Sequence, residues 1–191
     1  IVVDGSFICK KRNLANFKNL KFYSVKKIFD CSYNNIKNLK NTPRNVDTLI
    51  CTNNKIKSLK YVPVECNVII CSFNYLKDLK YCPNTLYELD CSYNYITCFK
   101  TKLKTIQTFN CSNNYLEHLL NGPLNVEEYD CSYNNLRTLY GAPKIVNKFI
   151  CYSNQYLNDY RYLPYVKKEL IIDLNINAIE KIVELSIDFK K

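Results

Sequence analysis

The chain has 191 residues, 47% of them hydrophobic, so it is long enough to bury a substantial core. Its formal net charge is +10, from 27 basic and 17 acidic residues. No run of about 18 apolar residues occurs, so we expect no membrane insertion. One histidine, three glycines and no paired cysteine motif leave no constellation for catalysis, so we expect a chain that is not an enzyme and that uses no cofactor or metal.

The first repeat unit along the chain is an irregular version of the units that follow. Phe7, Cys9, Leu14 and Phe17 have the later spacing, but 22 residues separate Cys9 from the next cysteine of the series, and Arg12 stands where later units have asparagine. A cysteine then returns every 20 residues, at Cys31, Cys51, Cys71, Cys91, Cys111, Cys131 and Cys151. A repeat this strict predicts a solenoid, in which each unit is one supersecondary element that stacks on its neighbours.

We number each unit so that its cysteine is position 6. Position 4 is then apolar, as are positions 11 and 14 wherever the spacing is kept, and position 9 is asparagine in all seven regular units. A strand across positions 4 to 6 would turn positions 4 and 6 inward and positions 2, 3 and 5 outward. Position 18 is usually proline, and we expect a reshaped turn where Leu103 replaces it.

The end of the chain departs from the repeat. One extra residue follows Cys151, residues 170–177 have the composition of a last strand, and Ile179, Ile182, Val183 and Leu185 have the spacing of an amphipathic helix over residues 178–189. Such a helix would cap the open end of the core. We therefore divide the chain into repeats at residues 1–169, with eight units of which the first and last are irregular, and a last strand with a helical cap at residues 170–191.

The repeated pattern resembles the leucine-rich repeat, L-x-x-L-x-L-x-x-N-x-L. It is similar to the compact, proline-bearing repeats of secreted bacterial effectors and to cysteine-bearing repeats of large DNA viruses of amoebae. The abundance of Lys, Asn, Ile and Tyr fits an A/T-rich genome. The resemblance implies an α/β-type solenoid of mainly short parallel strands, arranged as an arc with the sheet on its concave side and the helical cap at its C-terminal end. It also implies a non-catalytic scaffold for protein–protein interaction.

The cysteine series admits three interpretations. Inward packing of a small, nearly apolar thiol is favoured. Neighbouring parallel strands lie ~4.8 Å apart, which disfavours the closer Cβ approach of a disulfide, and the total of 11 cysteines is odd. Metal binding lacks both a C-x-x-C motif and histidine partners. Unpaired thiols indicate a reducing compartment such as the cytosol, which would be the host-cell cytoplasm for a viral protein. We expect Cys98 to be the most reactive thiol.

The position-9 asparagines have a structural explanation. The backbone bends after each strand, and an amide side chain can both donate to and accept from the groups that the bend leaves unpaired. We therefore interpret Asn74, Asn94 and Asn114 as scaffold residues.

The outward strand positions are acidic in a basic protein. They hold seven of the 17 acidic residues and only Lys27 and Lys148 of the 27 basic ones. The resemblance places the partner-binding face here, and an acidic groove favours a basic protein or peptide, although these charges could simply solvate an exposed sheet. The predicted site consists of Tyr87, Glu88, Asp90, Gln107, Asn110, Glu127, Glu128 and Asp130.

A second surface offers an alternative function, single-stranded nucleic-acid binding. Stacking would align two lysine rows with aromatic residues between them, although A/T-rich codons alone would supply both residue types. An anionic membrane surface is a weaker alternative, because no apolar wedge accompanies the charge. Finally, the unpaired sheet edge of the first repeat could pair with a second copy of the chain. The residues of the alternative surface are Lys37, Lys57, Lys77, Lys40, Lys60, Lys80, Tyr75, Tyr95 and Tyr115.

Overall fold

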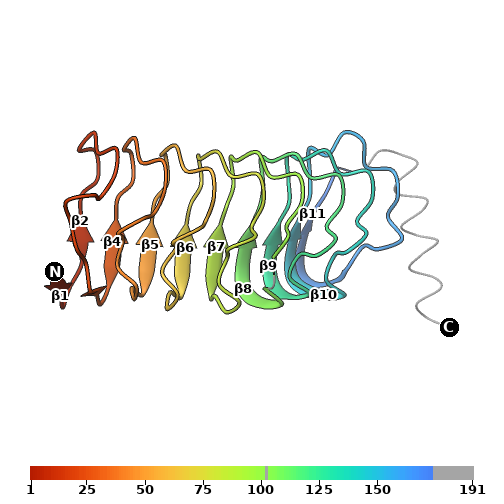
Figure 1. Cartoon of the computed structure of the whole chain (residues 1–191). Coiled ribbons are helices and arrows are strands. Elements are labelled where there is room, and N and C mark those ends of the chain that lie inside the picture. Colours follow the sequence, from red (N-terminus) through yellow and green to blue (C-terminus); the bar gives the residue numbers. More distant parts are fainter. Residues whose placement is uncertain (102, 174–191) are drawn as a thin grey trace.

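The computed structural model describes residues 1–101 and 103–173, which form a row of stacked turns with one strand on the same side of each (Figure 1). One parallel sheet has the order β11-β10-β9-β8-β7-β6-β5-β4-β2, and β1 pairs with β3 in a two-stranded sheet. The strands are β1 Val2–Val3, β2 Phe7–Ile8, β3 Ser24–Val25, β4 Ile28–Asp30, β5 Thr48–Ile50, β6 Val68–Ile70, β7 Glu88–Asp90, β8 Thr105–Asn110, β9 Asn125–Asp130, β10 Ile145–Ile150 and β11 Tyr165–Ile171.

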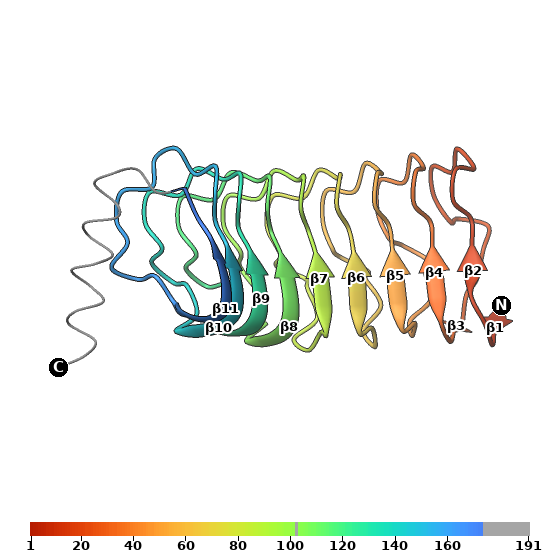
Figure 2. The same ribbon diagram turned by 180° about the vertical axis from the view of Figure 1, so that it is seen from behind.

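The register of the sheet follows the repeat. Leu49 pairs with Ile69, Ile69 with Leu89, and Leu89 with Phe109, so each strand is offset from the next by one unit. The strands follow one another in chain order from β2 to β11, as the view from behind also shows (Figure 2). The predicted solenoid of parallel strands is confirmed. At the N-terminal edge, β2 is only two residues long and offers few free backbone groups to a second copy.

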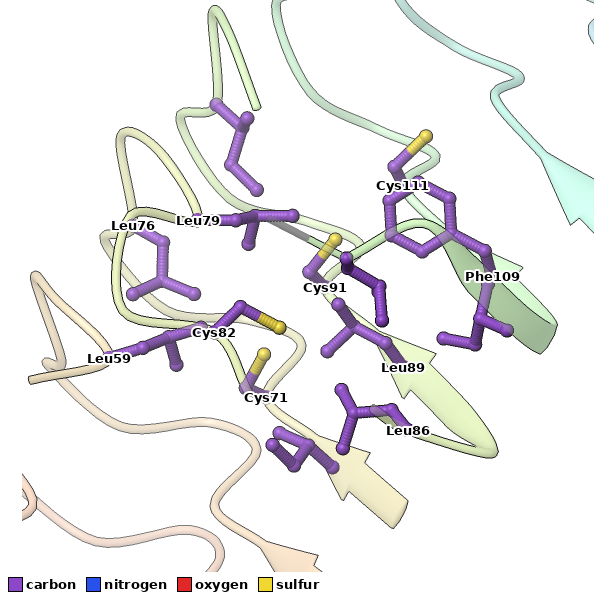
Figure 3. Packing of buried hydrophobic residues seen from close by; sticks show 14 of the residues in the cluster. Leu59, Cys71, Leu76, Leu79, Cys82, Leu86, Leu89, Cys91, Phe109 and Cys111 are labelled. Carbon is purple, nitrogen blue, oxygen red and sulfur yellow. The ribbon is translucent and has the colours of Figure 1, made fainter. Parts of the chain in front are cut away.

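The core is a column of inward side chains from every turn. Leu89, Cys91, Ile96 and Phe99, at positions 4, 6, 11 and 14, have no exposed surface. Figure 3 shows Leu89 and Cys91 near Cys71, Phe109 and Cys111 of the neighbouring units. Burying one large apolar side chain contributes about 1.5–3 kcal/mol, so each added turn extends a continuous apolar core. The cysteines are free thiols that pack in this core, as the first of the three interpretations predicts.

The position-9 asparagines join each turn to the one before it. Asn94 Nδ2 donates to the carbonyls of Cys71 and Cys91 at 3.1 Å, and its Oδ1 accepts the backbone N–H of Leu76 at 2.9 Å. The same pattern recurs at Asn54, Asn74, Asn114, Asn134 and Asn154. The scaffold role predicted for these residues is confirmed.

The expected helices are not present in the described part of the chain. Residues 1–101 and 103–173 contain strands and turns only, so the α/β-type description does not apply to them. A helical return is prevented by the turn at position 16, where Asn41, Tyr61 and Asn121 have φ between 63° and 75°, and by the proline two residues later. The helical cap expected over residues 178–189 lies outside the described residues. No helix among the described residues is long and apolar enough to cross a bilayer.

Two local departures have a visible cause. The last strand starts at Tyr165 rather than at residue 170, because β11 pairs with β10 from Ile145 onward through an irregular register near Val146. In the unit without proline, Lys100 takes the left-handed conformation with φ 47°, and Leu103 is fully buried, so the turn is reshaped as predicted.

Candidate functional site

The predicted concave residues lie together on three consecutive strands, β7, β8 and β9, except Tyr87, which directly precedes β7. Glu88 pairs in register with Thr108, which in turn pairs with Glu128. In the same way, Asp90 pairs with Asn110, and Asn110 pairs with Asp130. Each acidic pair is thus separated by a neutral side chain, at about twice the ~4.8 Å strand spacing. This spacing limits repulsion between the carboxylates while their fields add over the same face.

The carboxylates at position 5 also hold the backbone. Asp90 Oδ1 accepts the N–H of Ser92 at 3.0 Å and its Oγ–H at 2.6 Å, and Asp130 holds Ser132 in the same way at 2.9 and 2.6 Å. Asn110 Oδ1 accepts the N–H of Ser112 at 3.0 Å. These half-buried side chains close the bend after each strand, so part of the predicted binding set belongs to the scaffold. The sequence signal for this role is the D-C-S or N-C-S triplet, in which an Asp or Asn can form an Asx turn with the residue two places on.

The glutamates of this face are more available. Glu127 accepts one hydrogen bond from Asn147 Nδ2 at 3.1 Å. Glu88 and Glu128 form no hydrogen bond or ion pair within the described residues. Beyond them, Lys148 on β10 pairs with Glu169 on β11 at 2.6 Å, and this hydrogen bond is the main cause that raises the pKa of Lys148. Lys148 also lies in register beside Glu128, whose charge further raises the pKa of Lys148, so the open acidic character is greatest at Glu88 and is partly offset at Glu128.

A hollow lies at the start of the same strands. It has a volume of about 470 Å³ and is lined by Tyr87, Gln107 and Glu127 together with Asn147 and Lys167. Tyr87 is 59% exposed. Seven of the eight predicted concave residues thus lie on adjacent strands and Tyr87 directly precedes one; three of the eight line a hollow, and Glu88 and Glu128 form no ion pair within the described residues.

The structure divides the alternative surface into separate parts. Lys60 and Lys80, at position 15, lie over the rings of Tyr61 and Tyr81, with the ammonium nitrogens 5.1 and 5.3 Å from the ring centroids. These tyrosines are at position 16, and sequence reasoning did not single them out. The aromatic residues of positions 8 and 10 line a different groove that includes no lysine. The aromatic residues of this groove are thus separate from the tyrosines that contact Lys60 and Lys80, and the alternative surface stays a prediction.

The remaining reactive groups are engaged or buried. Burial raises the pKa of Cys71, Cys91 and Cys111 well above the ordinary thiol value, which suppresses their reactivity, whereas Cys98 is partly exposed. His118 Nδ1 accepts the N–H of Leu120 at 3.3 Å. Within residues 1–101 and 103–173, no group of three His, Cys, Asp or Glu could hold a metal ion.

A comparison with solved structures finds the same architecture. The chain matches YopM from Yersinia enterocolitica WA-314, a leucine-rich repeat protein, with a TM-score of 0.64 and 22% identity over 88% of this chain. The fold is a leucine-rich repeat-type solenoid. The match spans 42% of the YopM chain, so this solenoid corresponds to less than half of that protein. No protein-family model matches the sequence, and no curated protein sequence does.

Proposed function

We propose that the protein is a non-catalytic interaction scaffold that binds a basic protein or peptide on the concave face of β7 to β9. The single observation that carries this proposal is the pair of unpaired glutamates, Glu88 and Glu128, on an open sheet face in a chain with net charge +10. The rigid stack of turns keeps these charges at a fixed separation, which favours selective recognition because little ordering is needed on binding.

The hollow beside these glutamates adds an apolar contact. Tyr87 offers a large exposed ring at its edge, and tyrosine is a frequent anchor in protein interfaces because it combines an apolar body with a polar end. A partner segment that places a basic side chain near Glu88 and an apolar one near Tyr87 would use both features.

A randomised peptide library tests this proposal. Selected peptides should be enriched in Lys and Arg, and their binding, measured by calorimetry, should weaken as salt increases. The Glu88→Lys/Glu128→Lys variant should reduce affinity at least ~10-fold, about 1.4 kcal/mol. The matched control, Glu65→Lys/Glu117→Lys, makes the same charge change at exposed sites away from the face and should change affinity less than about twofold. Equal losses in both variants, or selection of peptides without basic residues, would refute the concave site.

We further propose that the protein works in a reducing compartment such as the cytosol, or the host-cell cytoplasm if its source is viral. The support is that all eleven cysteines are free thiols. We expect the protein to stay folded during incubation with millimolar reductant and to lose solubility during prolonged oxidation. A fold that needs oxidising conditions would contradict this location.

A further inference from the structure

A groove runs along the edge of the solenoid where the chain leaves each strand. It has a volume of about 570 Å³ and spans five turns, from Asn53 to Tyr133. Its floor is the column of position-9 asparagines, whose amide groups are already bonded to the backbone. Recognition in this groove therefore falls to its walls, which are the side chains of positions 8 and 10.

The walls are ladders of stacked rings. Phe73 and Tyr93, at position 8, stack with centroids 4.1 Å apart and planes 9° from parallel. Tyr75, Tyr95 and Tyr115, at position 10, stack at 5.7 and 5.8 Å with planes 11° apart. Neighbouring rings cover one another's faces, so a ligand ring can stack only where a ladder is interrupted.

Position 8 contains two such interruptions. Asn53 stands between Tyr33 and Phe73, and Asn113 stands between Tyr93 and Tyr133. Each places an asparagine between two ring-bearing turns, which lie ~9.6 Å apart at the strand spacing, enough for one further ring at the 4.1 Å separation of Phe73 and Tyr93. Asn113 Nδ2 donates to Ser112 Oγ at 3.3 Å, while its Oδ1 accepts no hydrogen bond within the described residues. An amide at the base of a ring-sized gap is suited to the polar edge of a nucleobase.

The backbone conformation does not account for the rings at position 8. Tyr33, Phe73, Tyr93 and Tyr133 have φ between 51° and 54°, a left-handed conformation that bulky residues seldom adopt. Asn53, Asn113 and Ser153 adopt the same conformation in the other units, with φ of 54° to 55°. Asparagine suits this backbone better, so ring contacts such as the stacking of Phe73 on Tyr93 must offset the strain, and contact with a ligand would give the same rings a further role.

The surrounding charge selects an anionic ligand. Lys10 and Lys11 lie over the Tyr33 ring from the preceding turn, at 5.2 and 5.3 Å from its centroid. Lys55 takes position 10 beside the first gap, and Lys57 and Lys77, at position 12, face the same outer side because the residues between them and position 10 are buried. This basic character belongs to the first gap, because position 12 of the unit that holds the second gap is Glu117. An apolar peptide would gain nothing from this field, whereas phosphates would.

From these observations we infer that the groove binds single-stranded nucleic acid, with a base stacked in each of the two position-8 gaps and with phosphates near the lysines beside the first gap. The gaps are three turns apart, about 14 Å at the strand spacing. Duplex nucleic acid cannot use them because its bases are already paired and stacked. This site is separate from the concave face and does not depend on the function proposed for it.

Fluorescence anisotropy of the full chain with a labelled single-stranded oligonucleotide tests the inference, with the duplex of the same sequence as comparison. At ~0.15 M salt we expect the single strand to bind at least ~10-fold more tightly than the duplex. The Tyr93→Asn/Tyr133→Asn variant removes both rings of one gap with a residue that position 8 already uses, so the fold is retained. It should weaken single-strand binding at least ~10-fold.

The matched control is Tyr61→Asn/Tyr81→Asn, which removes two exposed tyrosines at position 16, outside the groove. It should change affinity less than about twofold. If the protein binds single strand and duplex equally well, and neither binds at ~0.15 M salt, the attraction is nonspecific and the site is overturned. If both variants weaken single-strand binding equally, the contact lies elsewhere. If no nucleic acid binds and an aromatic peptide occupies the groove instead, the gaps belong to a protein partner.

Discussion

Two neighbouring columns of the solenoid, one inside and one outside, obey opposite rules. Position 9 is asparagine in all seven regular units, is nearly fully buried, and bonds two turns together. Position 8, the residue before it, varies among Tyr, Phe, Asn and Ser, is exposed or half-exposed, and keeps the same left-handed backbone throughout. Because the units of a repeat protein can be aligned with one another, this comparison separates two kinds of position. Uniform positions build the fold, and variable exposed positions are available for binding.

The largest expected effect concerns pH and the inner columns. Burial raises the pKa of ten thiols, to about 11 at Cys9 and Cys66 and about 12 at Cys82. Above pH ~8.5 the unfolded chain loses these protons while the folded chain keeps them, so the free energy of unfolding falls as pH rises. Each thiol lowers the free energy of unfolding by up to ~1.4 kcal/mol per pH unit. Within about one pH unit, ten thiols together therefore offset a typical free energy of unfolding of ~5–15 kcal/mol.

We therefore expect circular dichroism under reducing conditions to show cooperative unfolding between about pH 9 and 10 and little change between about pH 6 and 8. The Cys71→Ala/Cys91→Ala variant should show a shallower dependence of unfolding free energy on pH, because two of the ten thiols are gone. A fold that persists above pH ~11 would contradict the burial of the column.

The next effect comes from the asparagine column. Asn94→Ala leaves the carbonyls of Cys71 and Cys91 and the N–H of Leu76 unpaired in a buried site, and should lower the free energy of unfolding by ~3–5 kcal/mol in urea denaturation. Asn135→Ala, at the outward position 10, should cost less than ~0.5 kcal/mol. Similar losses at the two sites would remove the distinction between the columns.

Much of this division was predictable from the sequence, because the period fixes which residues share a column. The 20-residue step, the alternation across positions 4 to 6 and the amide chemistry of asparagine predicted the register, the inward cysteines and the scaffold role of Asn94. The hydrogen bonds of Asp90 and Asp130 to the following serines were not predicted, because an outward position on a strand was equated with a free side chain. The left-handed backbone of Tyr93 was not predicted either, since residue preference points away from it.

A smaller effect is expected at Tyr129, which occupies position 4 in the core. Its hydroxyl is buried and has only the thiol of Cys111, a weak hydrogen-bond partner, beside it, whereas Phe109 and Phe149 fill the same position in neighbouring units. Tyr129→Phe should therefore raise the free energy of unfolding by ~1 kcal/mol, measured by urea denaturation. A lower stability would show that the hydroxyl finds a partner in solution.

The smallest effect is expected in the outer column. Tyr93→Asn should leave the thermal midpoint within ~2 °C of the unmodified protein, because relief of the left-handed backbone offsets the lost stacking on Phe73. Tyr93→Val keeps an apolar side chain but is β-branched, and should lower stability by ~1–2 kcal/mol. A large loss with asparagine would show that the ring supports the fold rather than a ligand.

Thiol labelling of the native protein, followed by mass spectrometry of its peptides, tests the division into inner and outer columns most directly. The structure predicts that Cys98 reacts first, that Cys9, Cys66 and Cys82 follow slowly, and that the seven position-6 cysteines react only when the chain unfolds. Labelling of Cys71, Cys91 and Cys111 at the rate of Cys98 in the folded protein would contradict the inward register on which the scaffold, the concave face and the groove all depend.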